Sequence, residues 1–328
     1  MVPQTMSRAQ PGPSPIAPTD ESDCPLCHVG MRVRFRDIAV EETGETFRID
    51  ECPQCGLGRT RPIPTDLAPY YDAAYYGKRH GLTGRICNRR RLGFVRHWLG
   101  PGMGRSLLDF GCGEGDFLRA ARTQGWTGCG IERSWPTAIS GDLTVVASLE
   151  ELGGRKPFDC TTFWHVLEHL DDPIGTLKEL RGYLAPDGLV LAAVPNFGSW
   201  QARATGASWL HLDLPRHLFH FTAASIAKLF EVSGFRVDDI SFGEWEYDVI
   251  GWSQSLLNRG FGGRNEFFKT VSGRPSSGPR LRKMFHVTAG LGLSLLSAVP
   301  AWGESRLGRG GTLIAVARPV KTRASVHA

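Results

Sequence analysis

The stretch RSLLDFGCGEGDFL, residues 105–118, decides the fold that we predict for this chain. A short apolar run ends in Asp109, and glycines at Gly111, Gly113 and Gly115 lead into an amphipathic helical pattern. Glycine lets the backbone turn with positive φ and approach a ligand closely. The pattern therefore predicts a strand, a tight turn and a helix start, which is where α/β sheets bind nucleotide-like cofactors.

The residues around this turn indicate a positively charged cofactor. The spacing is G-x-G-x-G, not the G-x-G-x-x-G that receives a dinucleotide pyrophosphate. Asp109 adds a carboxylate, and a second predicted strand ends in Glu132, which could accept the two hydroxyls of a ribose. An acidic loop attracts a cation and repels a pyrophosphate. S-adenosylmethionine, with a sulfonium, an ammonium and one ribose, fits this site; the alternative is an ordinary βαβ turn without a ligand.

Three segments together resemble the class I S-adenosylmethionine-dependent methyltransferases: LLDFGCGEGDFL, GIE and FDCTTFWHVLEHLDDPIGTLKELRGYLAPDGLVLAAVPN. The resemblance covers roughly residues 107–242 and a last strand at 312–317. It implies cofactor contacts at the turn and near the ends of the first four strands, namely Asp109, Gly111, Gly113, Glu132, Ser148, Leu149 and Trp164. Many members have an Asp after the third strand, but this chain reads TVVASLEEL, so Ser148 or a backbone amide would bind the adenine.

The remaining strand patterns alternate with helical patterns, which is typical of a parallel sheet. We therefore predict an α/β fold, a Rossmann-like doubly wound seven-stranded sheet preceded by a small N-terminal zinc ribbon. The predicted strands are 106–110, 127–132, 144–146, 158–166, 188–196, 234–242 and 311–319. The resemblance implies that the last two strands form an antiparallel edge.

The chain has 328 residues, of which 41% are hydrophobic and 22% charged, as in ordinary soluble proteins. We expect one large domain and a small module. The expected divisions are a disordered leader 1–20, a zinc ribbon 21–60, a connector and lid helix 61–104, a methyltransferase core 105–249 and 311–320, a basic and apolar helical insertion 250–310, and a tail 321–328. The leader lacks the apolar run of a secretory signal, so we expect a cytoplasmic protein.

Four cysteines in two C-x2-C pairs, Cys24, Cys27, Cys52 and Cys55, predict a zinc site. The residues between the pairs alternate enough for a hairpin around 42–44, which makes a zinc ribbon. Two disulfides would require an oxidising compartment that nothing else in the sequence indicates. Four thiolates leave no open coordination position, so we expect the zinc to be structural.

Basic and aromatic residues near the ribbon allow more than one interpretation. Arg32, Arg34 and Arg36 alternate on one strand, but nearby acidic residues balance them, so we interpret them as a solvated face and not as a nucleic-acid surface. The connector holds a cluster of tyrosines, Tyr70, Tyr71, Tyr75 and Tyr76. Similar segments in the family form part of a lid over the cofactor, while simple packing between modules is the alternative.

Catalytic candidates follow the fourth and fifth predicted strands. The sequence HVLEH, residues 165–169, resembles the E-x-x-E-H of ubiquinone-pathway O-methyltransferases, which bind a divalent ion there. Here His165 replaces the first acid, which weakens the case for a second ion at His165, Glu168 and His169. On a helical turn these three side chains would share one face. Glu168 and His169 could instead bond the backbone and hold the loop.

The connection after the fifth strand, residues 196–222, is unusually long, and long ordered loops here are often functional. Its histidines have ordinary pKa values near 6.5, which suits a general base. We take His217 as the preferred base, followed by His165 and His220; the alternative is that residues 215–217 only cap the next helix. No N/D-P-P-Y/F sequence follows the fourth strand, which disfavours base N-methylation.

The C-terminal part of the chain is strongly basic. Residues 253–328 hold 12 Lys and Arg against 2 Asp and Glu, whereas the whole chain carries a net charge of only +5. An apolar stretch, 285–299, is shorter than the roughly 20 residues that span a bilayer. Residues 280–309 could lie in a membrane interface, pack on the main domain or join a dimer, and the sequence leaves this and the oligomeric state open.

These patterns predict an S-adenosylmethionine-dependent methyltransferase that acts on an oxygen or carbon of a small molecule, such as a sugar, a quinone or a lipid-linked intermediate. A cysteine-rich module before this core also resembles bacterial sugar-modifying methyltransferases. Two alternatives remain: an RNA methyltransferase that uses the ribbon and the basic tail, and a non-catalytic scaffold with the same fold.

Overall fold

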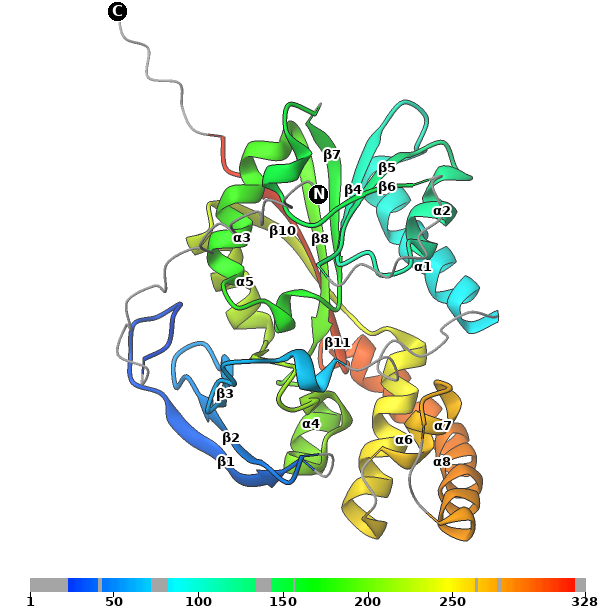
Figure 1. Cartoon of the computed structure of the whole chain (residues 1–328). Helices are drawn as coiled ribbons and strands as arrows, with labels where there is room; N and C mark the ends of the chain where they lie inside the picture. Colours follow the sequence, from blue (N-terminus) through cyan, green and yellow to red (C-terminus); the bar gives the residue numbers. More distant parts are fainter. Residues whose placement is uncertain are drawn as a thin grey trace, which may run out of the picture.

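The fold is built on one seven-stranded sheet and one four-stranded sheet (Figure 1). The computed structural model describes residues 23–40, 43–71, 82–133, 143–155, 157–262, 265–275 and 279–321. The predicted leader and nearly all of the predicted tail lie outside these residues.

The large sheet has the strand order β10-β11-β8-β7-β4-β5-β6. Its strands are β4 (Ser106–Phe110), β5 (Thr127–Ile131), β6 (Thr144–Val146), β7 (Phe158–Trp164), β8 (Leu184–Pro195), β10 (Phe235–Phe242) and β11 (Thr312–Pro319). The five strands from β6 to β8 pair in parallel, and β11 runs antiparallel to both β8 and β10. The predicted Rossmann-like seven-stranded sheet is confirmed, and β11, between the edge strand β10 and β8, is the reversed strand.

Helices cover both faces of this sheet, as its continuous apolar strands require. On one face lie α3 (Pro173–Leu180) and α5 (Ala223–Val232), and on the other lie α1 (Leu82–Leu99) and α2 (Asp116–Arg122) (Figure 1). Consecutive residues of β4 point to opposite faces, so buried Leu108 packs with the first pair and buried Leu107 with the second. The sheet is therefore the middle of three layers.

The small sheet joins the cysteine-rich module to the core. It has the order β1-β2-β3-β9, with β1 (Arg32–Ala39), β2 (Thr46–Glu51), β3 (Gly58–Arg61) and β9 (Phe219–His220). The predicted hairpin is present, because β1 and β2 pair antiparallel. The module is not separate, however, since β3 pairs with β9, which belongs to the long connection after β8.

Short helices fill the connections of the chain. They are η1 (Ala68–Tyr70), η2 (Glu150–Leu152), η3 (Leu167–His169), η4 (Arg181–Tyr183), α4 (Trp200–Thr205), η5 (Gly206–Ser208) and η6 (Leu210–Leu212). Three of these helices, α4, η5 and η6, lie together with strand β9 in the connection that is unusually long in the sequence.

A helical unit precedes β11 and consists of α6 (Trp245–Phe261), α7 (Glu266–Val271) and α8 (Arg280–Arg306). It begins five residues earlier than the predicted insertion. The apolar segment predicted at 285–299 is part of the 27-residue helix α8. Among the described residues, α8 is the one helix that is long and apolar enough to cross a membrane, with a mean hydropathy of 1.4 and 22% of that window buried.

Buried polar contacts fix this helical unit to the core. Glu304 of α8 is fully buried and accepts hydrogen bonds from Gln201 Nε2 at 2.9 Å and Trp252 Nε1 at 3.0 Å. Asp248 of α6, also buried, accepts a hydrogen bond from the Thr312 hydroxyl at 3.2 Å. Burial raises the pKa of Glu304 to about 7, so this attachment depends on pH.

We predict that Glu304→Gln stabilises the protein at pH 8. The pKa of Glu304 in the folded protein lies above its ordinary value of 4.5. The neutral carboxyl therefore contributes fully to the free energy of unfolding below pH 4.5, and this contribution is lost as the pH rises through about 7. A glutamine stays neutral, so its advantage over the wild type should be about 3 kcal/mol at pH 8 and absent at pH 4. Denaturant unfolding at both values measures it, and exposed Glu231→Gln is the control. An advantage that does not change with pH would contradict this explanation.

Candidate active site

The glycine turn after β4 has the backbone geometry that the sequence predicts. Gly111 and Gly113 have φ values of 71° and 52°, and Gly111 donates its N–H to the carbonyl of Ile131 at 2.8 Å. A Cβ at Gly111 would lie 2.5 Å from Val166 Cγ2. The missing side chain therefore lets the turn pack directly against the segment that follows β7.

Asp109 lies at the end of β4 as a buried carboxylate, with 3% of its surface exposed. It accepts a hydrogen bond of 2.7 Å from the Thr162 hydroxyl of β7. Burial raises the pKa of Asp109 to about 7, although Thr162 and Arg91 oppose this effect. A cation bound beside it would restore the ionised form.

Glu132 follows β5 and holds the same turn from the other side. Its carboxylate accepts the Gly113 N–H at 2.9 Å, and its own N–H bonds the Val146 carbonyl of β6 at 3.0 Å. Because β4 and β5 are parallel neighbours, Asp109 and Glu132 meet at one edge of the sheet.

The other predicted cofactor residues lie at the ends of neighbouring strands. Leu149 and Trp164 are buried, and Trp164 packs edge-on against Phe117 of α2 at 5.6 Å. The Ser148 hydroxyl lowers the pKa of Glu150 by hydrogen bonding to it. The hydroxyl keeps its acceptor lone pairs in this contact, so Ser148 and the backbone amide both stay predicted contacts of the adenine.

The sequence that forms this edge of the sheet matches a known protein family. Residues 85–240 match the family described as "Methyltransferase domain". The chain carries a class I S-adenosylmethionine-dependent methyltransferase domain.

Curated relatives of this methyltransferase domain are enzymes named ubiquinone biosynthesis O-methyltransferase. The protein from Salmonella paratyphi A is 25% identical over 39% of this chain and 59% of its own length, and the one from Paracidovorax citrulli is 30% identical over 39% and 60%. The chain thus matches about three fifths of the length of these relatives. Among solved structures, a SAM-dependent methyltransferase from Archaeoglobus fulgidus has 18% identity and a TM-score of 0.42, covering 71% of this chain and 93% of its own.

His165 is the first catalytic candidate after β7, and it lies between two carboxylates. Its Nε2 is 2.5 Å from Glu244 Oε2, and its Nδ1 is 3.5 Å from Glu168 Oε1. Burial opposes a charge on the ring, but Glu244 and Glu168 outweigh it and raise the pKa of His165 to about 10. At neutral pH the ring is therefore a cation and has no free nitrogen to accept a proton.

The backbone separates His165 from the two residues with which it was predicted to share a helical face. His165 has a φ of 59°, and only the following residues, Leu167–His169, form the short helix η3. The ring stacks on Tyr247 with centroids 4.6 Å apart. The predicted helical turn does not include His165, because its positive φ lies outside the helical region, although its ring still reaches Glu168.

Glu168 and His169 instead face His217 from the long connection. The candidate ligand atoms of these three residues all lie within 4.8 Å of one another, and the rings of His169 and His217 are 4.6 Å apart. Neither oxygen of the buried Glu168 carboxylate has a hydrogen-bond partner among the described residues. Burial and then His217 lower the pKa of His169 to about 4, so His169 is neutral.

His217, the preferred base, is oriented by its neighbours. Its Nδ1 lies 2.9 Å from the His211 carbonyl, which can only accept, so Nδ1 is a donor and Nε2 is the nitrogen that can take up a proton when the ring is neutral. The Asp213 carboxylate lies 3.8 Å from Nε2. Burial raises the pKa of Asp213, but Arg216 outweighs this effect and holds the pKa well below its usual range. The Asp213 carboxylate beside Nε2 is therefore negatively charged.

His220 lies behind this cluster in β9. The Thr60 hydroxyl of β3 donates to the His217 carbonyl at 2.5 Å, so it must accept from His220 Nε2 at 3.0 Å. Burial holds the pKa of His220 well below its usual range. In this arrangement His220 positions His217 through Thr60 and has no ring nitrogen directed at the cluster.

The sequence analysis missed two groups that organise the site. Glu244 is fully buried and pairs with Arg90 and Arg91 of α1 as well as with His165. The guanidinium of Arg91 lies over the Trp164 ring at 4.8 Å. The sequence gives no sign that arginines of α1 are buried, because arginines are usually solvated, and only the position of Glu244 after β10 could have suggested a partner.

The connector contributes one tyrosine to the site. The Tyr71 hydroxyl lies 2.9 Å from His169 Nδ1, so this segment reaches the histidine cluster, whereas the Tyr70 hydroxyl bonds Glu45 in the cysteine-rich module. Tyr75 and Tyr76, the rest of the predicted lid, lie outside the described residues.

The four cysteines of the predicted zinc ribbon gather in one cluster. Their sulfur atoms all lie within 4.8 Å of one another, and the sulfurs of Cys24 and Cys55 are 3.8 Å apart. Zinc–sulfur bonds of about 2.3 Å in a tetrahedron give sulfur–sulfur edges of about 3.8 Å. The hydrogen bond from Cys55 lowers the pKa of Cys24 to about 5, and no disulfide joins any described cysteines. The donor set fits zinc.

We predict that Glu132→Ala weakens binding of S-adenosylhomocysteine at least about tenfold, because the ribose loses a charged acceptor and the turn loses its bond at Gly113. Calorimetry measures the affinity. Glu179→Ala, an exposed carboxylate of α3, should bind like the wild type. Equal affinities for all three proteins would contradict the placement of the ribose at Glu132.

We also predict that Cys52→Ser abolishes zinc binding, lowering the metal content from about one ion per chain to none. Because β3 pairs with β9, the loss should lower the melting temperature of the whole chain in one transition. Metal analysis and calorimetry check both results. Cys87→Ser, outside the cluster, should retain the metal. Retention of zinc by Cys52→Ser would remove this ligand from the site.

Proposed function

We propose that this protein transfers a methyl group from S-adenosylmethionine to an oxygen or carbon atom of a small molecule. The observation that carries the proposal is the position of His217, which lies beside Glu168 and His169 with Nδ1 fixed as a donor to His211 and Nε2 3.8 Å from Asp213. The adjoining segment packs on the glycine turn through Val166. A base beside a cofactor turn is what deprotonation of a hydroxyl or an acidic carbon requires.

The cofactor, held by Asp109, Gly113 and Glu132, would supply an activated methyl group. In this proposal His217 Nε2 takes the proton of the acceptor, and the Asp213 carboxylate stabilises the imidazolium that forms. His165, already a cation between Glu168 and Glu244, cannot share this task and serves to fix the loop. His220 acts through Thr60 as a positioning residue.

A divalent ion at this place is a second option for the same atoms. Glu168 Oε2, which has no hydrogen-bond partner among the described residues, and the nearby nitrogens of His169 and His217 are suitable ligands, whereas His165, named as a ligand from the sequence, pairs with Glu168 Oε1 and Glu244. Since one lone pair cannot bind a metal and accept a proton, the two roles of His217 exclude each other.

We predict that His217→Ala lowers the rate of methyl transfer at least about a hundredfold and leaves S-adenosylhomocysteine binding unchanged. The assay follows labelled methyl transfer from S-adenosylmethionine to a panel of catechols, sugar nucleotides and isoprenoid quinols. Exposed His97→Ala is the matched control. Full turnover by His217→Ala would refute its role as the base, and a rate that depends on added Mg²⁺ would assign Nε2 to metal binding.

The same experiments separate the other functions. An RNA methyltransferase should label transcripts instead of small molecules, with binding that falls steeply with salt. A scaffold should bind the cofactor without turnover on any acceptor. The acid residues at the cofactor edge favour an enzyme over a scaffold, because the fold alone does not need a buried Asp109.

We further propose that the zinc ribbon 21–60 and the helical insertion act as accessory parts of a core at 105–249 and 311–320. The exposed face of α8 carries large apolar side chains, namely Leu281, Met284, Leu291, Leu295, Leu296, Val299 and Trp302. Arginines and a lysine lie at both ends, at 280, 282, 283 and 306. An apolar stripe with basic ends suits the surface of an anionic membrane, where a quinone or lipid-linked acceptor would reside.

We predict that the protein floats with vesicles containing anionic lipid and that a double variant, Leu295→Glu and Val299→Glu, does not. These side chains are 80% and 74% exposed, so the change should not disturb the core. Met103→Glu, at 80% exposure elsewhere, is the control. Failure of the wild type to float, together with a dimer that the double variant abolishes, would assign this face to a second copy.

A further inference from the structure

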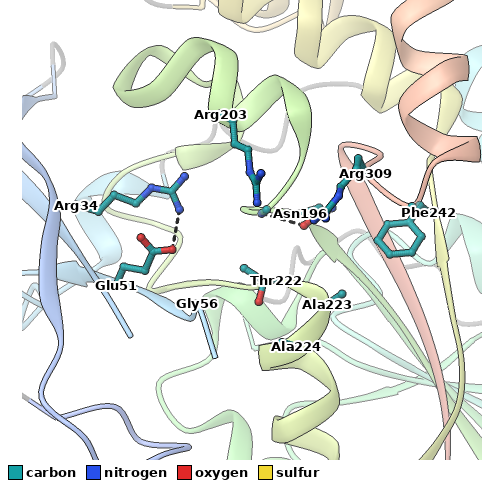
Figure 2. A pocket seen from close by; sticks show the side chains of 12 residues that line it. Arg34, Glu51, Gly56, Asn196, Arg203, Thr222, Ala223, Ala224, Phe242 and Arg309 are labelled. Atoms are coloured by element: carbon teal, nitrogen blue, oxygen red, sulfur yellow. Dashed lines mark hydrogen bonds and ion pairs between the residues drawn. The ribbon is translucent and has the colours of Figure 1, made fainter. Parts of the chain in front are cut away.

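A cavity of about 540 Å³ lies where the cysteine-rich module meets the core (Figure 2). It is bounded by β1 and β2 on one side, by α4, by the start of α5, and by the end of β10 with the loop before β11. Asn196 directly follows β8, so the cavity opens at the same edge of the sheet as the cofactor turn. We call it the arginine pocket.

Three arginines from three separate parts of the chain line this pocket: Arg34 of β1, Arg203 of α4 and Arg309 before β11. Figure 2 shows Arg34 and Arg203 directed toward the middle of the cavity and Arg309 at its far side. Arg34 is half-buried, with 20% of its side chain exposed. The sequence-based expectation of a solvated face therefore does not hold for Arg34.

The positive charge of the arginine pocket is only partly neutralised. Arg34 pairs with Glu51 at 3.0 Å, but no ion pair joins Arg203 or Arg309 to a carboxylate of the described residues. Burial lowers the pKa of Arg34, Glu51 opposes this, and Arg203 lowers the pKa further. Arg203 is thus close enough to repel Arg34. Three guanidinium groups and one carboxylate leave a net charge of +2.

The floor of the pocket adds a second source of positive potential. The first residues of the ten-residue helix α5, Ala223 and Ala224, line the cavity, and their N–H groups have no acceptor within the helix. Thr222 caps this helix and donates its hydroxyl to the Cys55 carbonyl at 2.8 Å. The cysteine cluster therefore holds the start of α5 against the module.

The backbone at Gly56 lets the cysteine-rich module lie close to the start of α5. Gly56 has a φ of 69°, and a Cβ there would lie 3.1 Å from Thr222 Cγ2. The residue after the second cysteine pair thus lets the module approach α5 and complete the cavity.

We propose that the arginine pocket binds the diphosphate of the methyl acceptor. Planar guanidinium groups bind phosphate oxygens in pairs, and helix N-termini favour phosphate groups. The net charge of +2 balances a diphosphate diester and most of the charge of a diphosphate monoester, whereas a carboxylate would balance only half of it. The volume holds a diphosphate together with part of the group attached to it.

The assignment of this ligand as the acceptor rests on the proposed methyl transfer, while binding of a diphosphate does not. Two sources share the chemistry: a nucleotide-linked sugar and a prenyl diphosphate. Calorimetry with uridine diphosphate glucose and with geranyl diphosphate, each without the methyl donor, tests binding and distinguishes the sources.

We expect at least one probe to bind the full-length zinc-loaded protein. Arg203→Gln and Arg309→Gln should each weaken binding at least about tenfold, because each removes hydrogen bonds to a charged group. Arg203→Lys, which keeps the charge without the paired donors, should fall between. Arg96→Gln removes an exposed arginine of α1 outside the pocket and should change nothing.

S-adenosylhomocysteine affinity, measured on the same variants, separates the two proposals. The pocket proposal is overturned if the protein binds S-adenosylhomocysteine but neither diphosphate probe at millimolar concentration. It is also overturned if the arginine variants bind the probes as tightly as the wild type does. In both cases the proposed methyl transfer stands. If the probes bind as expected but no protein binds S-adenosylhomocysteine, methyl transfer fails and the diphosphate site stands.

Discussion

The buried carboxylate of Asp109 is the constraint on which the cofactor edge depends. Its hydrogen bond to Thr162 joins β4 to β7, and its burial favours the neutral acid until a cation arrives. The same edge holds the turn at Gly111 and Gly113, which have no side chains, and the second carboxylate at Glu132, and we propose that these groups let the cation approach. The fold thus places negative charge where a sulfonium would bind.

The histidine cluster shows how the accessory module enters the chemistry that we propose. Strand β3 pairs with β9, and Thr60 bonds both His217 and His220. The four cysteines therefore help to fix a loop whose residues face the end of β7. The cysteine-rich module looks independent in the sequence, but in the structure it packs against the residues of the candidate site.

Charge of opposite sign is separated along one edge of the sheet. Acidic groups lie at the glycine turn, the histidine cluster with its neutral His169 follows β7, and arginines gather beyond β8. The positive sulfonium of the methyl donor would lie at the acidic end of this edge, and the negative diphosphate of the acceptor would lie at the basic end. This arrangement links the proposed reaction to the proposed acceptor class.

The sequence alone determined the seven-stranded fold, the cofactor turn and the cysteine cluster, because each is encoded in local spacing: alternating apolar residues, glycines after an aspartate, and paired cysteines. It named His165 and His217 but could not separate their roles. Only the tertiary structure brought Glu244 to His165, Asp213 to His217, and Arg34 to Arg203. Those roles depend on burial and on charges from distant segments, and no local pattern in the chain records either.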